Sequence, residues 1–259
     1  MLTTKPVVKS FKMKNDSLKV LEKKLQREKN PKSGSLIAKD ILKLIEKLEI
    51  AERGTPPSPL RYVGKGTRGE LWFRNRLLWL RTIPLEKDIS FMITHSEPPV
   101  YYEGENGRNS ADLLGIWHSK ASTKLGVAEL KSGEKGDHML YAILEGARNA
   151  YLHRLAIKRL SSGWSNALNQ SHQRGEGLFW SNVWNEGNPF NDKLTKTHLI
   201  IIGDSKWIQA QEKWNNEAKK ITDAIKKNFG FETSIYSLDK KAQPGSKPYV
   251  LLPLEKWKY

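Results

Sequence analysis

The chain has 259 residues, and its 44 Lys and Arg residues outnumber its 28 Asp and Glu residues, which gives a formal net charge of +16. The absence of cysteine excludes a disulfide framework, a thiolate zinc site and a cysteine nucleophile. Hydrophobic residues make up 38% of the chain, enough for a core, and no stretch is long and apolar enough to span a bilayer. We therefore expect a cytoplasmic protein whose charge attracts nucleic acid and not a membrane. A solvated lysine-rich surface is the alternative interpretation.

Residues 1–55 are predicted to form a basic helical N-terminal extension. Two apolar stripes at helical spacing follow one another in this region, separated by a break at 31–34. The stripes consist of Leu18, Leu21 and Leu25, and then of Ile37, Ile41, Leu44 and Leu48. We expect the two helices to pack on the main domain or on a partner subunit, and a dedicated DNA-binding arm is the alternative. The Pro-rich stretch 54–59 predicts a stiff linker, so a second domain is expected to span 56–259.

The second domain is predicted to alternate between helices and strands. A helix is expected over 67–80, and a long helix carries Leu140 to Leu155 on one face. A further helix carries Trp214 to Ile225. Strands are expected at 89–94, 100–102, 111–117, 125–130, 198–203, 233–238 and 249–252. This order predicts an α/β domain with a central mixed β-sheet flanked by helices.

An insertion at 161–197 interrupts this pattern. It is rich in Gly, Ser and Asn, yet it carries five large aromatic residues, among them Trp164. Long insertions with this composition are functional or disordered, and the aromatic residues argue against disorder. Base stacking, insertion into a nucleic-acid groove and a subunit interface are the functional interpretations. The alternative is that these rings cover the sheet or the N-terminal helices.

Two acids and a lysine are predicted to meet at one end of the sheet. Glu129 and Lys131 close an apolar strand, and strand alternation places them on one side with Leu130 on the other. The neighbouring strand begins near Asp112, so pairing can bring its carboxylate beside Glu129. Carboxylates and the Leu130 backbone carbonyl are oxygen ligands of the kind that Mg²⁺ prefers, and Mn²⁺ can substitute. Lys131 would orient or help deprotonate a metal-bound water and stabilise charge at a phosphoryl group.

At these residues the chain resembles the PD-(D/E)XK, or restriction-endonuclease-like, nuclease superfamily. The resemblance spans roughly residues 67–203 and implies that Asp112 and Glu129 hold one or two Mg²⁺ ions beside the motif lysine, Lys131. It also implies that Glu70, in the first helix, is the additional acid found in many members. Ala111 replaces the proline of the motif, and the Gln-x-x-x-Tyr signature of the exonuclease-like branch is absent. The alternatives are a cross-strand salt bridge for the trio and a capping box with Thr67 for Glu70.

Several basic residues near the trio are candidates for contacts to phosphate. Lys135 and His138 precede the long helix, and Arg148 and Arg154 lie off its apolar stripe. With Trp164, the residues Lys135, Arg148 and Arg154 form the predicted nucleic-acid-binding set. A charged solvent-exposed face is the alternative for the arginines, and solvation is the preferred interpretation for His138. Asp204 is expected to cap the next helix.

These features predict a Mg²⁺-dependent nuclease that hydrolyses phosphodiester bonds in DNA. An endonuclease of restriction type or one selective for DNA structure is expected, and such enzymes often form homodimers to cut two strands. Two alternatives remain open. One is a non-catalytic nucleic-acid-binding or assembly module on the same fold, and the other is a nuclease directed at RNA.

Overall fold

The computed structural model describes residues 17–50, 69–80, 82–97, 99–100, 109–133, 137–159, 196–238 and 254–256. Four features expected from the sequence lie outside these ranges: the linker 54–59, Lys135, the strand 249–252, and all of the insertion with Trp164 except its last two residues, 196 and 197. In the part of the chain that is described, no helix is long and apolar enough to cross a membrane.

A mixed seven-stranded β-sheet forms the centre of the protein, with strand order β1-β2-β5-β6-β7-β8-β9. Neighbouring strands from β1 to β6 are antiparallel, β6, β7 and β8 run parallel, and β9 is antiparallel to β8. The strands are β1 (Thr82–Glu86), β2 (Ile89–Ser96), β5 (Leu113–Ser119), β6 (Ser122–Lys131), β7 (Thr197–Asp204), β8 (Glu232–Leu238) and β9 (Leu254–Lys256). A separate two-stranded ladder joins β3 (Pro99–Val100) to β4 (Asn109–Ser110). The expected α/β class with a mixed sheet is confirmed.

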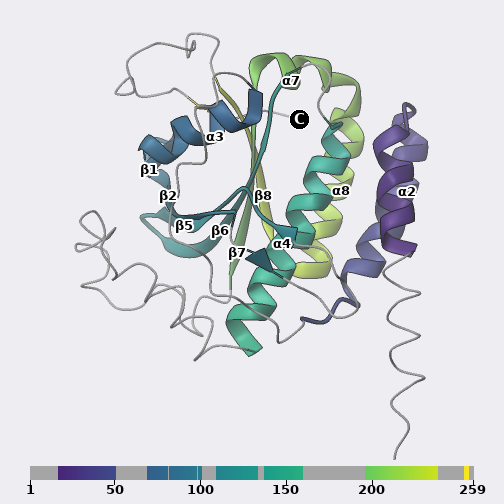
Figure 1. Cartoon of the computed structure of the whole chain (residues 1–259), viewed down its shortest axis with the longest axis horizontal. Coiled ribbons are helices and arrows are strands. Elements are labelled where there is room, and N and C mark those ends of the chain that lie inside the picture. The colour runs from purple at the N-terminus through teal and green to yellow at the C-terminus, as the bar shows by residue number, and fades with distance from the viewer. Residues whose placement is uncertain are drawn as a thin grey trace, which may run out of the picture.

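Helices cover both faces of the sheet, as Figure 1 shows. On one face α3 (Gly69–Leu80) contributes Leu78 to an apolar core that also contains Phe91 and Ile202. On the other face lie α4 (Met139–Arg159) and α8 (Asn215–Phe229), whose core includes Leu144, Leu199 and Ile225. The short α7 (Ser205–Ala210) and the 3₁₀ turn η2 (Glu212–Trp214) connect β7 to α8. Asp204 accepts a hydrogen bond from the backbone N–H of Trp207 at 2.7 Å, so its expected capping role is confirmed.

The two N-terminal helices add a further layer outside α4 and α8 (Figure 1). The helix at residues 17–27 buries Leu18 and Leu25 completely, and α2 (Pro31–Ile45) buries Ile41 and Ile45. All four side chains belong to the same apolar core as α4 and α8. The expectation that these helices pack on the main domain is therefore confirmed. Burying four aliphatic side chains contributes on the order of 1.5–3 kcal/mol each relative to exposure.

The structure corrects one local expectation and adds one strand that was not predicted. The stretch 31–34 does not separate the helices but forms the first turn of α2, because Asn30 accepts hydrogen bonds from the N–H groups of Lys32 and Ser33. Proline fits the first helical turn, where its missing N–H has no partner to lose. The strand β1 was not expected, since it is short and contains Pro84. It lies at the edge of the sheet, where a proline is tolerated.

Candidate metal-binding and phosphodiesterase site

Strand register brings Asp112 and Glu129 together. Leu113 pairs with Ala128 in the antiparallel β5–β6 ladder. Asp112 precedes Leu113 and Glu129 follows Ala128, so the same register places Asp112 across from Glu129. The Asp112 Oδ2 accepts a hydrogen bond of 2.7 Å from the Leu130 backbone N–H. The side chains of Asp112 and Glu129 are hydrogen-bonded to each other. Because an N–H and the C=O of the same strand residue point to the same neighbour, the Leu130 carbonyl is directed toward Asp112 as well.

Burial raises the pKa values of both carboxyl groups. Burial is the main cause of the raised pKa of Asp112, and Lys131 and the Leu130 N–H oppose it. Glu129 is only 2% exposed, and burial followed by the charges of Asp112 and Glu145 holds its pKa well above the usual range. Two acids in contact cannot both be ionised cheaply. Without a cation, the pair therefore retains a proton that ordinary carboxylates would lose.

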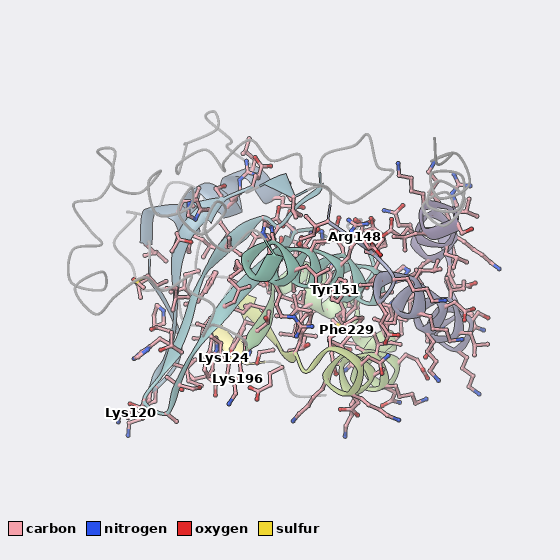
Figure 2. All side chains as sticks on the ribbon, turned by 90° about the horizontal axis from the view of Figure 1, so that it is seen from below. Lys120, Lys124, Arg148, Tyr151, Lys196 and Phe229 are labelled. Atoms are coloured by element: carbon pink, nitrogen blue, oxygen red, sulfur yellow. The ribbon has the colours of Figure 1, made fainter. Side chains whose placement is uncertain are left out.

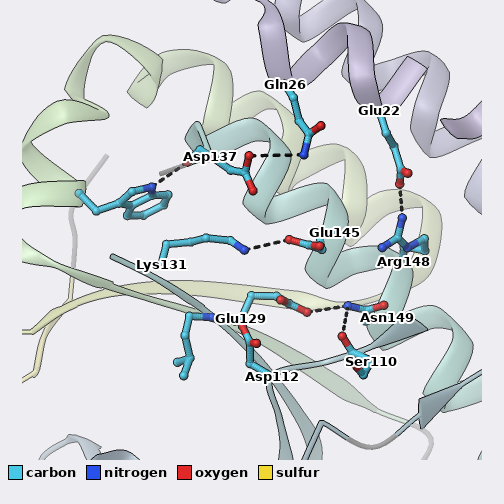
Figure 3. Close-up of polar contacts among 12 residues, drawn as sticks. Glu22, Gln26, Ser110, Asp112, Glu129, Lys131, Asp137, Glu145, Arg148 and Asn149 are labelled. Atoms are coloured by element: carbon cyan, nitrogen blue, oxygen red, sulfur yellow. Dashed lines mark hydrogen bonds and ion pairs between the residues drawn. The ribbon is translucent and has the colours of Figure 1, made fainter. Parts of the chain in front are cut away.

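The helix α4 fixes Glu129 from above the sheet. The Asn149 side-chain amide donates to Glu129 Oε1 at 2.7 Å and to the Ser110 carbonyl at 3.1 Å (Figure 3). One turn earlier, Gly146 lets α4 approach the sheet closely, because a Cβ there would lie 2.6 Å from Leu199 Cδ1 and 2.9 Å from Glu129 Cγ. This close approach places the amide of Asn149 within hydrogen-bonding reach of Glu129.

Gly146→Ala is expected to destabilise the protein by about 1–3 kcal/mol, because the added methyl group overpacks the contact between α4 and β6. Helix propensity alone would give the opposite sign, since alanine stabilises a helix interior by about 1 kcal/mol relative to glycine. Chemical denaturation measures the difference. Ala224→Gly on α8 is the control, and because Ala224 is only partly buried against the core it should cost little more than the propensity term of about 1 kcal/mol. A Gly146→Ala variant more stable than the parent protein would contradict this packing of α4.

Lys131 is held by α4 and not by the acid pair. Its Nζ contacts Glu145 Oε2 at 2.9 Å, and Figure 3 shows this pair lying next to Glu129 and Asp112. Burial by itself would lower the pKa of Lys131, but the charges of Glu145, Glu129 and Asp112 outweigh it and raise the pKa above its ordinary value. The side chain is therefore a fixed ammonium. This favours stabilisation of charge over removal of a proton from water as its role.

Glu70 lies in the first turn of α3 and faces the same group of charges. Although the residue is exposed, partial desolvation followed by the Asp112 charge raises the pKa of its carboxyl to about 7. Lys131 acts in the opposite direction, and Glu145 and Asp137 add to the rise. Thr67, the other half of the expected capping box, is outside the described residues. The structure thus brings all four predicted catalytic residues into one electrostatic cluster.

A turn after β6 and the start of α4 form the border of the cluster. Gly133 adopts a positive φ of 77°, and its N–H donates to Asp204 Oδ2 at 2.8 Å. The Asp137 carbonyl accepts from the Trp207 indole at 2.7 Å, and its carboxyl contacts Gln26 of the 17–27 helix at 3.4 Å. Burial raises the pKa of Asp137, with Lys131 opposing and Glu145 adding to the shift. The side chain of Gln26 therefore links the 17–27 helix to Asp137, at the border of the charge cluster.

The structure corrects two of the four residues in the predicted nucleic-acid-binding set. Arg148 is only 8% exposed and is ion-paired with Glu22, on the side of α4 that faces the N-terminal helices (Figure 2). Arg154 donates to the Phe229 carbonyl at 2.6 Å, and its guanidinium lies 4.5 Å from the Phe231 ring centroid. Both arginines therefore join structural elements to one another and do not face a groove. Lys135 and Trp164 are outside the described residues.

His138 was expected to be solvated, and this is wrong. The ring is buried, stacks on Trp214 with centroids 4.3 Å apart, and contacts the Leu25 carbonyl. The residue precedes α4 at a place where the 17–27 helix and η2 converge. Its neighbours in space come from segments remote in sequence, which local pattern does not reveal.

Three residues of the site were not predicted: Glu145, Gly146 and Asn149. Glu145 and Asn149 are one helical turn apart, so they share a face of α4. A signal was present, because a glycine within an apolar helical pattern points to close packing. Which strand that helix face covers depends on the tertiary fold.

The donor set of the cluster fits a hard cation, although it is not a preformed cage. In the described ranges, no group of three or more His, Asp or Glu side chains is arranged to hold a metal ion. The acid pair nevertheless consists of the buried Glu129 and the half-buried Asp112, hydrogen-bonded to each other and with raised pKa values, and a divalent cation would replace the retained proton. Comparisons with protein-family models, with curated proteins and with solved structures found no match. The chemistry of the cluster therefore has to be inferred from its own residues.

Proposed function

We propose that this protein is a Mg²⁺-dependent phosphodiesterase that cleaves nucleic acid, with DNA as the substrate and endonucleolytic cleavage as the mode. The observation that carries the proposal is the contact between the Asp112 and Glu129 carboxyls beside the Lys131 ammonium. The net charge of +16 supports a polyanionic substrate. The choice of DNA and of an endonuclease, and a homodimer that cuts both strands, rest on the resemblance to PD-(D/E)XK nucleases.

The arrangement of the charges favours this function over a structural salt bridge. A cross-strand salt bridge would neutralise Asp112 or Glu129 with Lys131, whereas the direct ion pair of Lys131 is made with Glu145 of α4. The two acids are left without an ion-pair partner of their own, and burial makes it costly to ionise both of them. Such an arrangement costs stability, and sites of this kind are concentrated where function requires them.

In this proposal Asp112, Glu129, the Leu130 carbonyl and Glu70 hold Mg²⁺ or Mn²⁺, which supplies positive charge at a phosphate and a more acidic water. The protein residues have distinct tasks. The Leu130 N–H orients Asp112, and Asn149 orients Glu129. Glu145 keeps the Lys131 ammonium in place, where it stabilises negative charge that develops on the phosphoryl oxygens.

A cleavage panel tests the proposal directly. Supercoiled plasmid, linear and branched DNA, single-stranded DNA and RNA are incubated with the protein and Mg²⁺, Mn²⁺ or a chelator. We expect nicking or linearisation of the plasmid with either metal and none with the chelator. Salt-sensitive binding without cleavage under any metal would contradict the enzyme and favour the non-catalytic binding module. Cleavage restricted to RNA would retain the chemistry and change the substrate.

A further inference from the structure

Arg74 is a buried cation on the helix that carries Glu70. The two residues are one helical turn apart, so they share a face of α3. The Arg74 side chain is only 9% exposed, and its Nη1 contacts Glu97 Oε1 at 2.5 Å. Its Nε is also buried and makes no hydrogen bond to any part of the chain that the structure describes. A buried pair that leaves one donor unsatisfied is a poor source of stability, so its presence needs another explanation.

Glu97 connects this ion pair to Asp112. It follows directly after β2, and its backbone N–H donates to the Asp112 carbonyl at 3.0 Å. Its φ is 47°, and no other non-glycine residue in the described ranges has a positive φ. Such a conformation persists only where the surroundings hold it, and it is concentrated at functional sites. Arg74 therefore contacts a residue whose backbone is held beside Asp112.

The ion pair fixes where α3 lies along the sheet. The apolar contacts of α3, to which Leu77 and Leu78 contribute, are non-directional and tolerate a small shift of the helix. A charge-assisted hydrogen bond is directional and short. Because Glu70 shares the face of Arg74, a shift of α3 would move the Glu70 carboxyl relative to Asp112.

We propose that Arg74 is a positioning residue that, through Glu97, sets the distance between the Glu70 and Asp112 carboxyls and so completes the metal site. The inference rests on the proposed function, in which both carboxyls hold Mg²⁺ or Mn²⁺. Arg74 itself does not touch the metal or the nucleic acid. Its charge alone would oppose the binding of a cation, and its effect on the place of Glu70 outweighs that repulsion.

Metal binding in the absence of nucleic acid tests this role. Mn²⁺ is titrated into the whole protein, and its electron paramagnetic resonance signal reports the free ion. Arg74→Met removes the charge and keeps most of the side-chain length, whereas Arg74→Lys keeps the charge. Lys124→Met is the matched control, because the Lys124 side chain is also 9% exposed and is ion-paired at 2.5 Å, with Glu232.

We expect Arg74→Met to weaken Mn²⁺ binding by at least about tenfold, as loss of a group that orients a metal ligand does. Arg74→Lys should stay within about threefold of the parent, because an ammonium can replace the single contact to Glu97. Lys124→Met should lower the melting temperature but leave the Mn²⁺ affinity within about twofold, since distant sites act independently. If Arg74→Met does not fold, Arg74→Gln, which removes the charge and keeps a donor, should change the affinity in the same direction.

A double-variant cycle with Glu70→Gln shows whether Arg74 acts through Glu70. In the Glu70→Gln background, Arg74→Met should change the Mn²⁺ affinity by less than about twofold. In cleavage assays, Arg74→Met should raise the Mn²⁺ concentration that gives half of the maximal rate and leave most of the rate at saturating Mn²⁺.

Unchanged or tighter Mn²⁺ binding by Arg74→Met would overturn the inference, since tighter binding is what the loss of a nearby positive charge alone produces. Equal weakening by Lys124→Met, or a full effect of Arg74→Met in the Glu70→Gln background, would overturn it too. A protein that shows the expected Mn²⁺ affinities but cleaves no nucleic acid would contradict the proposed function and support the role of Arg74.

Discussion

Asp112→Asn is expected to abolish cleavage and, in metal-free buffer at mildly alkaline pH, to raise the melting temperature. Loss of a metal ligand removes several kcal/mol of transition-state stabilisation, which corresponds to at least about a thousandfold in rate. The gain in stability has a separate cause. The asparagine side chain can accept the Leu130 N–H and donate to Glu129, so it keeps both contacts and removes one of two adjacent buried charges.

The pH dependence of stability follows from the same pair. The pKa values of Asp112 and Glu129 are raised in the folded protein above their ordinary values of 3.8 and 4.5. Above those values the unfolded chain loses these protons while the folded protein retains them, so the free energy of unfolding falls as pH rises through the window up to the raised values. Below the ordinary values both states are protonated and the pair gives no dependence. Asp112→Asn should flatten the decline.

Thermal unfolding with and without Mg²⁺ measures both effects. At a free Mg²⁺ concentration of about 100 times its Kd, binding stabilises the folded protein by about 2.7 kcal/mol, and the variant should lack this gain. Glu232→Gln is the control, and it should lower the melting temperature. A hydrogen bond from Lys124 lowers the pKa of Glu232 in the folded protein, so the ionised carboxylate stabilises the fold. A melting temperature of Asp112→Asn below that of the parent in metal-free buffer would show that the two carboxyls do not repel.

Lys131→Met is expected to reduce the cleavage rate by about 10²–10³-fold, because it removes the cation that faces the developing phosphoryl charge. It also leaves Glu145 without its partner, and breaking a buried pair costs about 3–5 kcal/mol. Glu145 keeps some solvent contact, with 22% of its side chain exposed, so we expect the lower end of that range. The Mg²⁺-induced rise in melting temperature should persist, since Asp112 and Glu129 are intact.

The double variant Lys131→Met, Glu145→Gln separates catalysis from folding. It removes both charges, so stability should largely recover while cleavage stays slow. Lys124→Met is the matched control, since Lys124 is a buried lysine of the same strand with its own ion pair to Glu232 at 2.5 Å. Lys124 lies at the other end of β6, away from Arg148 in Figure 2. The Lys124→Met variant should therefore lose stability but not activity. A double variant that cleaves at the parent rate would remove Lys131 from the mechanism.

Periodicity in the sequence was sufficient to predict the elements that carry the acids. Alternation along residues 125–131 placed Glu129 and Lys131 on one side, and the register of β5 and β6, which begins at Leu113 and Ala128, places Asp112 next to Glu129. Apolar spacing also predicted α4, α8 and the two N-terminal helices. These are local properties, because the repeat of a strand or helix is set by its own backbone geometry.

The surroundings of the site were decided by the tertiary structure. Sequence pattern suggested that Arg148 and Arg154 faced a groove. Packing of the 17–27 helix against α4 gave Arg148 an internal partner, and the end of α8 and the turn after it gave one to Arg154. The sequence pattern gave no indication that Glu145 would hold Lys131 or that Asn149 would hold Glu129. A helical repeat fixes which residues share a face, whereas the crossing of α4 over β6 fixes what that face touches, and this depends on Gly146 meeting Leu199 from a strand more than fifty residues later.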